Sequence, residues 1–236
     1  MTNNRGSKSA AAISVLAAAV IFAVFSLFRT VESVSLASSQ STVNKIGYGL
    51  EVDEGELRDV IAARESGIWF GDRARIHSDA ALARILLAER TQDADERETL
   101  LDAAGQDLET SLRLNPGNPY AWFRLAYARN LQAGPDRRVA EALRLSLLTG
   151  PHEPRLVFTR LPLALAAMEH FDAPTLSLLQ RQIRFAWRRA PRQTAFLSVS
   201  FGRQDFFRQA IALTDPEGVT LFLEYTGFLD ELRPQR

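Results

Sequence analysis

Residues 10–28 form a run of nineteen amino acids without a charged side chain, and this run constrains the fold more than any other stretch. At about 1.5 Å of rise per residue it would make a helix of about 28 Å, close to the hydrocarbon thickness of a bilayer, about 30 Å. Only two polar residues, Ser14 and Ser26, interrupt it, so the helix has no polar face for the surface of a soluble domain. We therefore predict a single transmembrane helix at residues 10–28, in contact with the lipid bilayer.

The charges before this run predict its orientation. Arg5 and Lys8 precede it, and no acidic residue accompanies them. Because positively charged flanks stay in the cytoplasm, residues 1–9 are expected there, and the chain after residue 28 is expected in the periplasm of a bacterial inner-membrane protein. A cleaved secretory signal is the alternative, since the small residues 35–39 offer a cleavage point; the apolar run exceeds the roughly 7–15 residues of a signal core, which favours the retained anchor.

Composition removes several functional classes. The formal net charge is zero, so nothing indicates a nucleic-acid partner. The chain has no cysteine, which excludes disulfides, thiolate catalysis and cysteine metal sites together. Its 236 residues are enough to bury a sizeable core.

After the apolar run, residues 29–50 are rich in Ser, Thr, Val and Gln with little periodicity, which predicts a linker. Residues 51–236 then keep a helical rhythm to the end of the chain. We expect a first helix from about Asp53, with acidic residues in its first turn. We expect a second helix with Ser78 as its N-cap.

Two prolines three residues apart indicate a joint between helices. Asn115-Pro116 should end one helix, because proline disfavours helical geometry in the residue before it. Asn118 can cap the next helix with Pro119 at its first position, where the missing N–H costs nothing. A bulky residue, a leucine and a small residue then follow at helical spacing: Trp122, Leu125 and Ala126.

These residues resemble the tetratricopeptide repeat, a helix-turn-helix unit of about 34 residues. In that family a bulky residue, a leucine and a small residue pack along the first helix, and a small–large–small series followed by proline marks the second. Two series in this chain fit the second pattern: Ala104, Leu108, Ser111 and Pro116, then Val139, Leu143, Ser146 and Pro151. Small residues there let two helix backbones approach closely. The resemblance is clearest over residues 81–151.

Two positions depart from the family pattern: Arg129 stands where an aromatic residue is common, and Gly150 replaces the usual acid before the proline. The resemblance implies an all-α fold in which residues 51–236 form a tetratricopeptide-like α-solenoid of about five stacked helical hairpins. It also implies a protein or peptide partner on the helical domain and no cofactor.

The C-terminal third is expected to continue these hairpins. Pro162 should lie inside a helix and kink it, and Asp172 should cap a helix that ends before Pro191. Residues 196–201, FLSVSF, alternate like a strand, but a strand without a partner would leave its backbone groups unpaired, so we predict helix. Asp215 and Pro216 are expected to open the last helix.

Charge is unevenly distributed along the chain. Residues 51–110 contain sixteen acids and seven arginines, whereas residues 181–208 contain seven arginines and only Asp205. Arg181, Arg184 and Arg188 are spaced to form a stripe on one helix. The stripe is either a solvated helix face or a contact with an acidic partner surface, anionic lipid head groups or an anionic polymer.

No arrangement of catalytic residues is found in the sequence. His77, His152 and His170 are expected in turns or at helix ends, without the spacing of metal ligands, and no nucleophile or phosphate-binding motif is present. We therefore expect no enzyme, no catalytic residue and no metal site. We expect a membrane-anchored, non-catalytic protein–protein interaction scaffold of the bacterial cell envelope, serving envelope or exported-polysaccharide assembly. An obligate structural subunit of a membrane protein complex is the alternative, and the sequence gives no signal for an oligomeric state.

Overall fold

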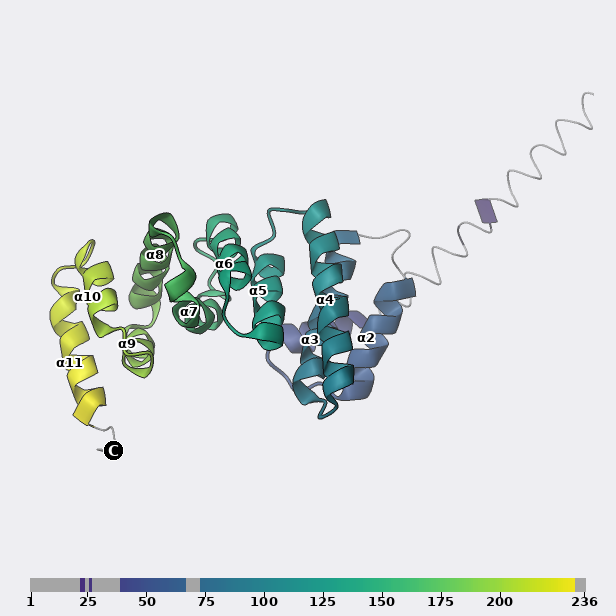
Figure 1. The fold of residues 1–236 in the computed structure, drawn as a ribbon, viewed down its shortest axis with the longest axis horizontal. Coiled ribbons are helices and arrows are strands. Elements are labelled where there is room, and N and C mark those ends of the chain that lie inside the picture. The colour runs from purple at the N-terminus through teal and green to yellow at the C-terminus, as the bar shows by residue number, and fades with distance from the viewer. Residues whose placement is uncertain (1–21, 24–25, 27–38, 67–72, 232–236) are drawn as a thin grey trace, which may run out of the picture.

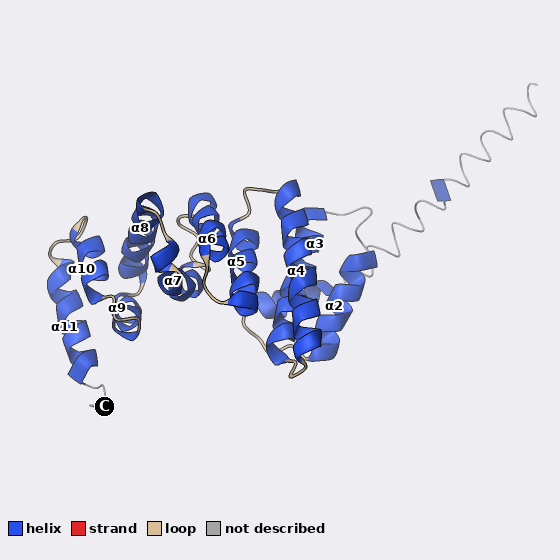
Figure 2. Ribbon diagram, viewed as in Figure 1, coloured by secondary structure: helices blue, strands red, loops and turns tan. Residues whose placement is uncertain are grey.

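The computed structural model describes residues 22, 23, 26, 39–66 and 73–231, and this part of the chain is all-α, without a β-strand (Figures 1 and 2). The predicted transmembrane helix lies almost wholly outside the described residues. Among the described helices, none is both long and apolar enough to cross a membrane. The helices have these bounds: α2 Glu54–Ser66, α3 Arg73–Arg90, α4 Ala94–Leu114, α5 Pro119–Ala133, α6 Arg137–Thr149, α7 Val157–Ala166, η1 Met168–His170, α8 Ala173–Arg189, α9 Pro191–Ser200, α10 Gln204–Ala212 and α11 Gly218–Glu231.

The helices follow one another along the long axis of the molecule, from α2 at one end to α11 at the other (Figure 1). Most contacts join helices that are neighbours in sequence, such as α3 with α4 and α5 with α6. Further contacts join every second helix: α3 with α5, α6 with α8, α8 with α10 and α9 with α11. The chain is therefore built mainly from local contacts between consecutive antiparallel helices.

The expected linker is helical in its second half, since residues 39–47 form a helix. One face of this segment is buried or half-buried: Ser39, Thr42, Val43 and Ile46. Val43 and Ile46 pack against a cluster built on Val52, Leu57 and Val60. The spacings of three, one and three residues are the pattern of one helix face, although the segment is too polar to stand out as a core helix.

Local capping explains where several helices begin. Asp53 Oδ1 accepts a hydrogen bond from the N–H of Glu56 at 2.8 Å, and Glu56 Oε2 accepts one from the N–H of Asp53 at 3.2 Å, which is a reciprocal capping box. Asn118 caps α5 with Pro119 at its start, as predicted, and Asp172 caps α8. The stretch 196–201 belongs to α9 and its end, so the prediction of helix there is confirmed.

The start of α3 differs from the prediction. The helix begins at Arg73, so Ser78 is an internal residue and not its N-cap. Ala74 and Ile76 are buried and extend the apolar face toward the N-terminus. The Ser78 hydroxyl is instead used by Arg124 of α5, whose Nη1 donates to Oγ at 2.7 Å.

Three helices end with the same backbone geometry. The residues after α4, α6 and α8 have similar dihedral angles, with φ/ψ of −141/81° at Asn115, −139/65° at Gly150 and −149/78° at Ala190. Each donates its N–H to the carbonyl four residues earlier and is followed by a proline; after α4 the acceptor is Ser111 and the proline is Pro116. The proline prevents continuation of the helix and fixes a repeated joint.

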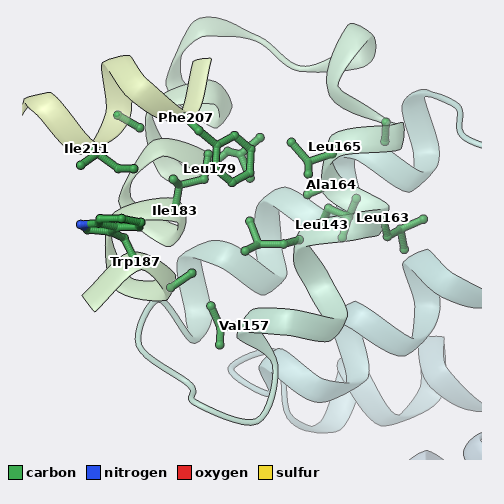
Figure 3. Packing of buried hydrophobic residues seen from close by; sticks show 14 of the residues in the cluster. Leu143, Val157, Leu163, Ala164, Leu165, Leu179, Ile183, Trp187, Phe207 and Ile211 are labelled. Atoms are coloured by element: carbon green, nitrogen blue, oxygen red, sulfur yellow. The ribbon is translucent and has the colours of Figure 1, made fainter. Parts of the chain in front are cut away.

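The largest apolar cluster among the described residues extends from α5 to α11 (Figure 3). Leu143 from α6, Leu161 from α7 and Ile183 from α8 are fully buried in it. Trp187 packs edge-on against Phe222 of α11 at 5.9 Å between ring centroids. Its Nε1 donates to Asp215 Oδ2 at 2.9 Å, and Asp215 Oδ1 accepts from the N–H of Gly218, the first residue of α11. Asp215 therefore connects the last helix to the core.

Candidate functional site

A groove beside α3 and α5 is the strongest candidate site in the described part of the chain. Its cavity of about 350 Å³ is bounded on one side by the helical segment 39–47 and on the other by α3, α5 and the connection to α7. We call it the α3–α5 groove. Its lining residues are Val43, Asn44, Gly47, Tyr48, Leu82, Tyr120, Arg124 and Arg155.

The groove combines aromatic and basic groups and has no carboxylate among its lining residues. Tyr48 is largely exposed, with 74% of its surface accessible. Arg155 is also exposed and forms no ion pair with a described residue, so its guanidinium is available to a ligand. Such a lining suits a peptide with an acidic and an apolar side chain.

Two of the lining side chains are held in place by the fold. Arg124 Nη1 donates to the carbonyl oxygen of Ser78 at 3.0 Å, and burial lowers the pKa of Arg124 against the opposing effect of Asp79. Burial and a hydrogen bond with Glu153 raise the pKa of Tyr120 to about 12. The raised pKa keeps Tyr120 a neutral phenol at neutral pH.

A buried ion pair joins α2 to α3, and the N-terminal segment is hydrogen-bonded to it. Arg64 of α2 lies 3.4 Å from Asp79 of α3, and both side chains are almost completely buried. Arg64 Nη2 also donates to Gln40 Oε1 at 3.2 Å, and Arg75 lies 3.6 Å from the same aspartate. Burial lowers the pKa of Arg64, and Asp79 opposes that shift. The segment that forms one wall of the groove is thus joined to α2 and α3 by polar contacts.

A second cavity, of about 590 Å³, lies between α6 and the start of α8, but its charges are largely occupied. Arg137 and Glu141, both in its lining, lie 3.3 Å apart. Asp172 is the N-cap of α8, and its hydrogen bonds to Thr175 lower its pKa. We therefore rank this cavity below the α3–α5 groove.

The predicted repeat-packing residues lie between the helices of α3 to α6. Ala104, Leu108, Leu125, Ala126 and Leu143 are at most 2% exposed. Two serines with no exposed surface bind the starts of the preceding helices: Ser111 Oγ donates to the carbonyl of Ala74 at 2.6 Å, and Ser146 Oγ donates to that of Pro119 at 2.9 Å.

The ends of the two repeated joints are tied by further hydrogen bonds. Trp122 Nε1 donates to the carbonyl of Pro116 at 2.8 Å, so this half-buried ring closes the joint that precedes it. Pro116 and Pro151 are exposed. At the second joint Arg160, with no exposed surface, donates to the carbonyls of Ser146 at 2.6 Å and Gly150 at 2.9 Å. The Ser146 carbonyl, which also accepts from the N–H of Gly150, thus has two donors at the end of α6.

A third series with the same spacing occurs in α8, and the sequence analysis did not recognise it. Leu179, Ile183 and Ala186 have no exposed surface and precede Pro191 by the same intervals as the first two series precede their prolines. Only its first member departs from the pattern, since leucine replaces the small residue. The identical spacing of four, three and five residues was the signal that could have revealed it.

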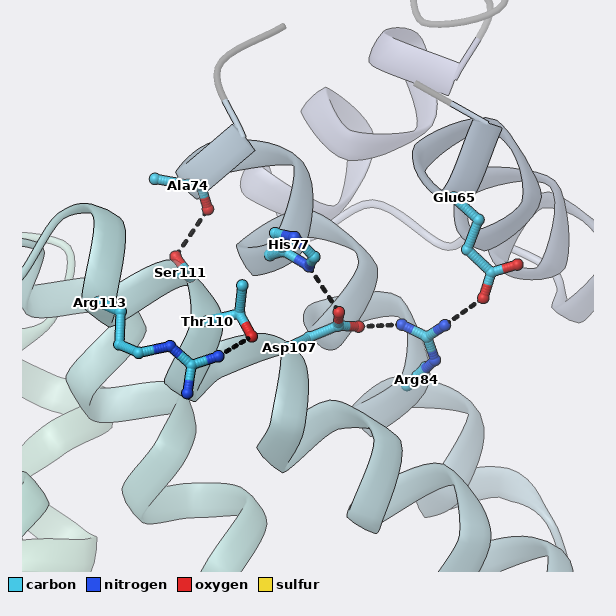
Figure 4. Close-up of polar contacts among 8 residues, drawn as sticks. All are labelled: Glu65, Ala74, His77, Arg84, Asp107, Thr110, Ser111 and Arg113. Atoms are coloured by element: carbon cyan, nitrogen blue, oxygen red, sulfur yellow. Dashed lines mark hydrogen bonds and ion pairs between the residues drawn. The ribbon is translucent and has the colours of Figure 1, made fainter. Parts of the chain in front are cut away.

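The three histidines are in different surroundings. His77 lies inside α3, contrary to the expectation of a turn or helix end, and its Nδ1 is 2.7 Å from Asp107 Oδ1 of α4 (Figure 4). Arg84 joins Asp107 to Glu65, so this cluster links α2, α3 and α4. His152 lies in a turn against Phe185, and His170 ends η1. Across the described residues, no group of three or more histidine and carboxylate side chains could hold a metal ion.

The predicted arginine stripe lies on α8, with Arg181 and Arg188 exposed and Arg184 half-buried between them. Arg184 Nη1 is buried without a hydrogen-bond partner. Burial lowers the pKa of Arg184, and the two neighbouring arginines lower it further. None of the three forms an ion pair with a described carboxylate.

Comparison of the chain with protein-family models, with curated proteins and with solved structures gives no match. The class that the structure itself defines is an all-α protein.

Proposed function

We propose that this protein is a non-catalytic binding scaffold of the bacterial cell envelope, held at the inner membrane by residues 10–28 with its helical domain in the periplasm. Residues 51–236 would form a tetratricopeptide-like stack of helical hairpins that recruits a protein or peptide, in envelope or exported-polysaccharide assembly. The repeated joints after α4, α6 and α8 support the stack, because three buried residues and a proline recur at equal spacing. Small residues at such joints permit the close approach of helices.

The lining of the α3–α5 groove is the main support for the proposed binding function. Its exposed Tyr48 and Arg155 face a cavity without an acidic residue in its lining. We therefore propose that the groove binds a peptide segment that carries an acidic side chain.

Site-specific photo-crosslinking of the full chain in its native membranes tests this role. A photoreactive phenylalanine analogue in place of Tyr48 or Arg155 should give discrete adducts with the partner. The same analogue in place of Arg113, an exposed residue at the end of α4 outside the groove lining, is the matched control and should give none. Equal adducts at all three positions, or none at either groove position, would contradict a partner in the groove.

A separate measurement tests the anchor. An alkaline phosphatase fused after residue 236 should be active, and the intact mass of the purified chain should include residues 1–38. An active fusion on a chain that lacks these residues would favour the cleaved signal. An inactive fusion would exclude the periplasmic placement while leaving the crosslinking result intact.

The obligate-subunit alternative is favoured by one observation. Several large apolar side chains are exposed at the C-terminal end, among them Phe196, Leu223 and Phe228, with 52–62% of their surfaces accessible. A permanent partner would cover such side chains. The fragment from residue 50 distinguishes the two roles on size exclusion at about 500 mM NaCl, where exposed ion pairs are screened, since a monodisperse monomer favours the scaffold and aggregation favours the obligate subunit.

A further inference from the structure

The arginines of α8 and the start of α9 have few acidic residues near them in the sequence. Only three acids occur between residues 154 and 214, and each is already engaged. Glu169 pairs with Arg203, Asp205 pairs with Arg208, and Asp172 caps α8. The arginines without an ion pair to a described carboxylate are Arg181, Arg184, Arg188, Arg189 and Arg192, which we call the basic surface.

The basic surface is accessible to a partner. Arg181, Arg188 and Arg192 are exposed. Arg181, Arg184 and Arg188 occupy one helix face over about 10 Å, at about 1.5 Å per residue. The other two arginines of the basic surface lie over aromatic rings. Arg189 is 5.5 Å from the centroid of Phe185, and Arg192 is 5.7 Å from that of Tyr225. These ring contacts orient the guanidinium groups without neutralising their charge.

The opposite imbalance occurs at the other end of the chain. The arginines of α2 to α5 pair across neighbouring helices, as in Arg58 with Glu96 at 3.0 Å and Arg129 with Glu109 at 3.2 Å. Exposed acids remain around the first of these pairs without a described cation partner. They are Glu51 and Glu54 at the start of α2 and Asp95 and Glu98 at the start of α4, which we call the acidic surface.

The contact between Arg58 and Glu96 places the two parts of the acidic surface beside each other. Along the row of helices, this surface and the basic surface lie toward opposite ends (Figure 1). The chain has no net charge, so two copies are not repelled as a whole. Two neutral molecules with oppositely charged ends attract when the basic end of one meets the acidic end of the other.

We propose that the partner of the basic surface is a second copy of this chain, which docks its acidic surface there in a head-to-tail contact. The contact joins two different surfaces, so the dimer keeps one unused surface of each kind and further copies can be added. Arg184 between Arg181 and Arg188 gains a compensating carboxylate when the second copy docks. The association is weak, because exposed ion pairs each contribute little, and it depends on salt.

The test uses the full chain in an uncharged detergent, with sedimentation velocity over a concentration series. At about 50 mM NaCl, where screening is weak, the wild-type chain should sediment as dimers and larger species. At about 500 mM NaCl, where screening is strong, it should sediment as a monomer. A wild-type chain that remains monomeric at low salt overturns the proposal and redirects the basic surface to a lipid or to another protein.

Two variants identify the surfaces. The basic variant carries Arg181→Gln, Arg188→Gln and Arg192→Gln, and the acidic variant carries Glu51→Gln, Glu54→Gln and Glu98→Gln. Each should associate at least about tenfold more weakly than the wild type, from three lost pairs. The matched control, with Arg113→Gln, Arg137→Gln and Arg138→Gln, removes the same charge from exposed sites outside the basic surface and should associate like the wild type.

Mixing the two variants gives the sharpest result. The intact acidic surface of one can bind the intact basic surface of the other, and no further copy can join. An equimolar mixture should therefore form a one-to-one dimer and nothing larger, although each variant alone is monomeric at the same concentration. A mixture that stays monomeric, or a control variant that loses association equally, would show that complementary surfaces are not the cause.

Discussion

Replacing Gly150 with alanine should destabilise the contact between the start of α5 and the end of α6. A Cβ atom at Gly150 would lie 2.6 Å from Cβ and 2.7 Å from Cγ of Pro119, the first residue of α5. Ordinary contacts between carbon atoms are about 3.5–4.0 Å, so the overlap is about 1 Å. Pro119 is a rigid ring, and its carbonyl is held by the Ser146 hydroxyl, so relief requires the contact to open. We expect a loss of about 1–3 kcal/mol in the free energy of unfolding.

The assay is thermal unfolding of the full chain followed by circular dichroism. For a chain of this size, 1 kcal/mol corresponds to about 2–4 °C in Tm. Gly105→Ala is the matched control, because Gly105 lies inside α4 and a Cβ there would meet no atom within 4 Å. It should stabilise the protein by about 0.5–1 kcal/mol, through helix propensity. If Gly150→Ala is as stable as the wild type or shifts Tm upward like the control, the close approach of the two helices is not rigid and the reasoning fails.

Two further predictions concern single side chains. Ser111→Ala removes the buried hydrogen bond to the carbonyl of Ala74 and should cost about 0.5–1.5 kcal/mol, measured by urea unfolding; no loss would show that the bond adds nothing to the joint. Burial and hydrogen bonds to glutamates raise the pKa of Tyr120 and Tyr127 to about 12 from 10.0. The stability contributed by the two neutral phenols is therefore complete below pH 10 and is lost as pH rises toward 12. In an absorbance titration of the folded chain, Tyr120→Phe and Tyr127→Phe should each remove a late-titrating phenol, and loss of an ordinary step near pH 10 instead would contradict this.

Local chemistry made the helix joints predictable from the sequence. Asn118 with Pro119, and Asp172 before α8, each follow from interactions within a few residues, and the structure places the caps there. The start of α3 was not predictable in this way. Serine is a common N-cap residue, so the sequence predicts that the helix begins after Ser78, whereas in the structure it begins at Arg73. The Ser78 hydroxyl is occupied by Arg124, forty-six residues later, and only the fold brings the two together.

The candidate groove was beyond sequence analysis for the same reason. Its aromatic and basic groups come from the N-terminal segment, α5 and the connection to α7, as Tyr48, Tyr120 and Arg155 illustrate. These residues lie far apart in the sequence, so no sequence pattern predicts that they meet; only the packing of the helices brings them together. The helical segment 39–47 carried a readable signal in Thr42, Val43 and Ile46, but a short amphipathic stretch with few large apolar residues resembles a polar linker.

The position of the groove affects which partners can reach it under the proposed anchor. Residue 39 begins the helical segment that forms one wall, and its neighbour Gln40 binds the buried Arg64. Between residue 28, the end of the proposed membrane helix, and residue 39, even a fully extended chain spans at most about 40 Å. The wall of the groove would thus be tied to the bilayer within that distance, and the hydrogen bond from Arg64 to Gln40 joins the wall to α2. A partner at the membrane surface can therefore reach the groove, whereas a partner held farther from the membrane cannot. A long flexible insertion between residues 28 and 39 should weaken recruitment of such a membrane-surface partner without changing the groove.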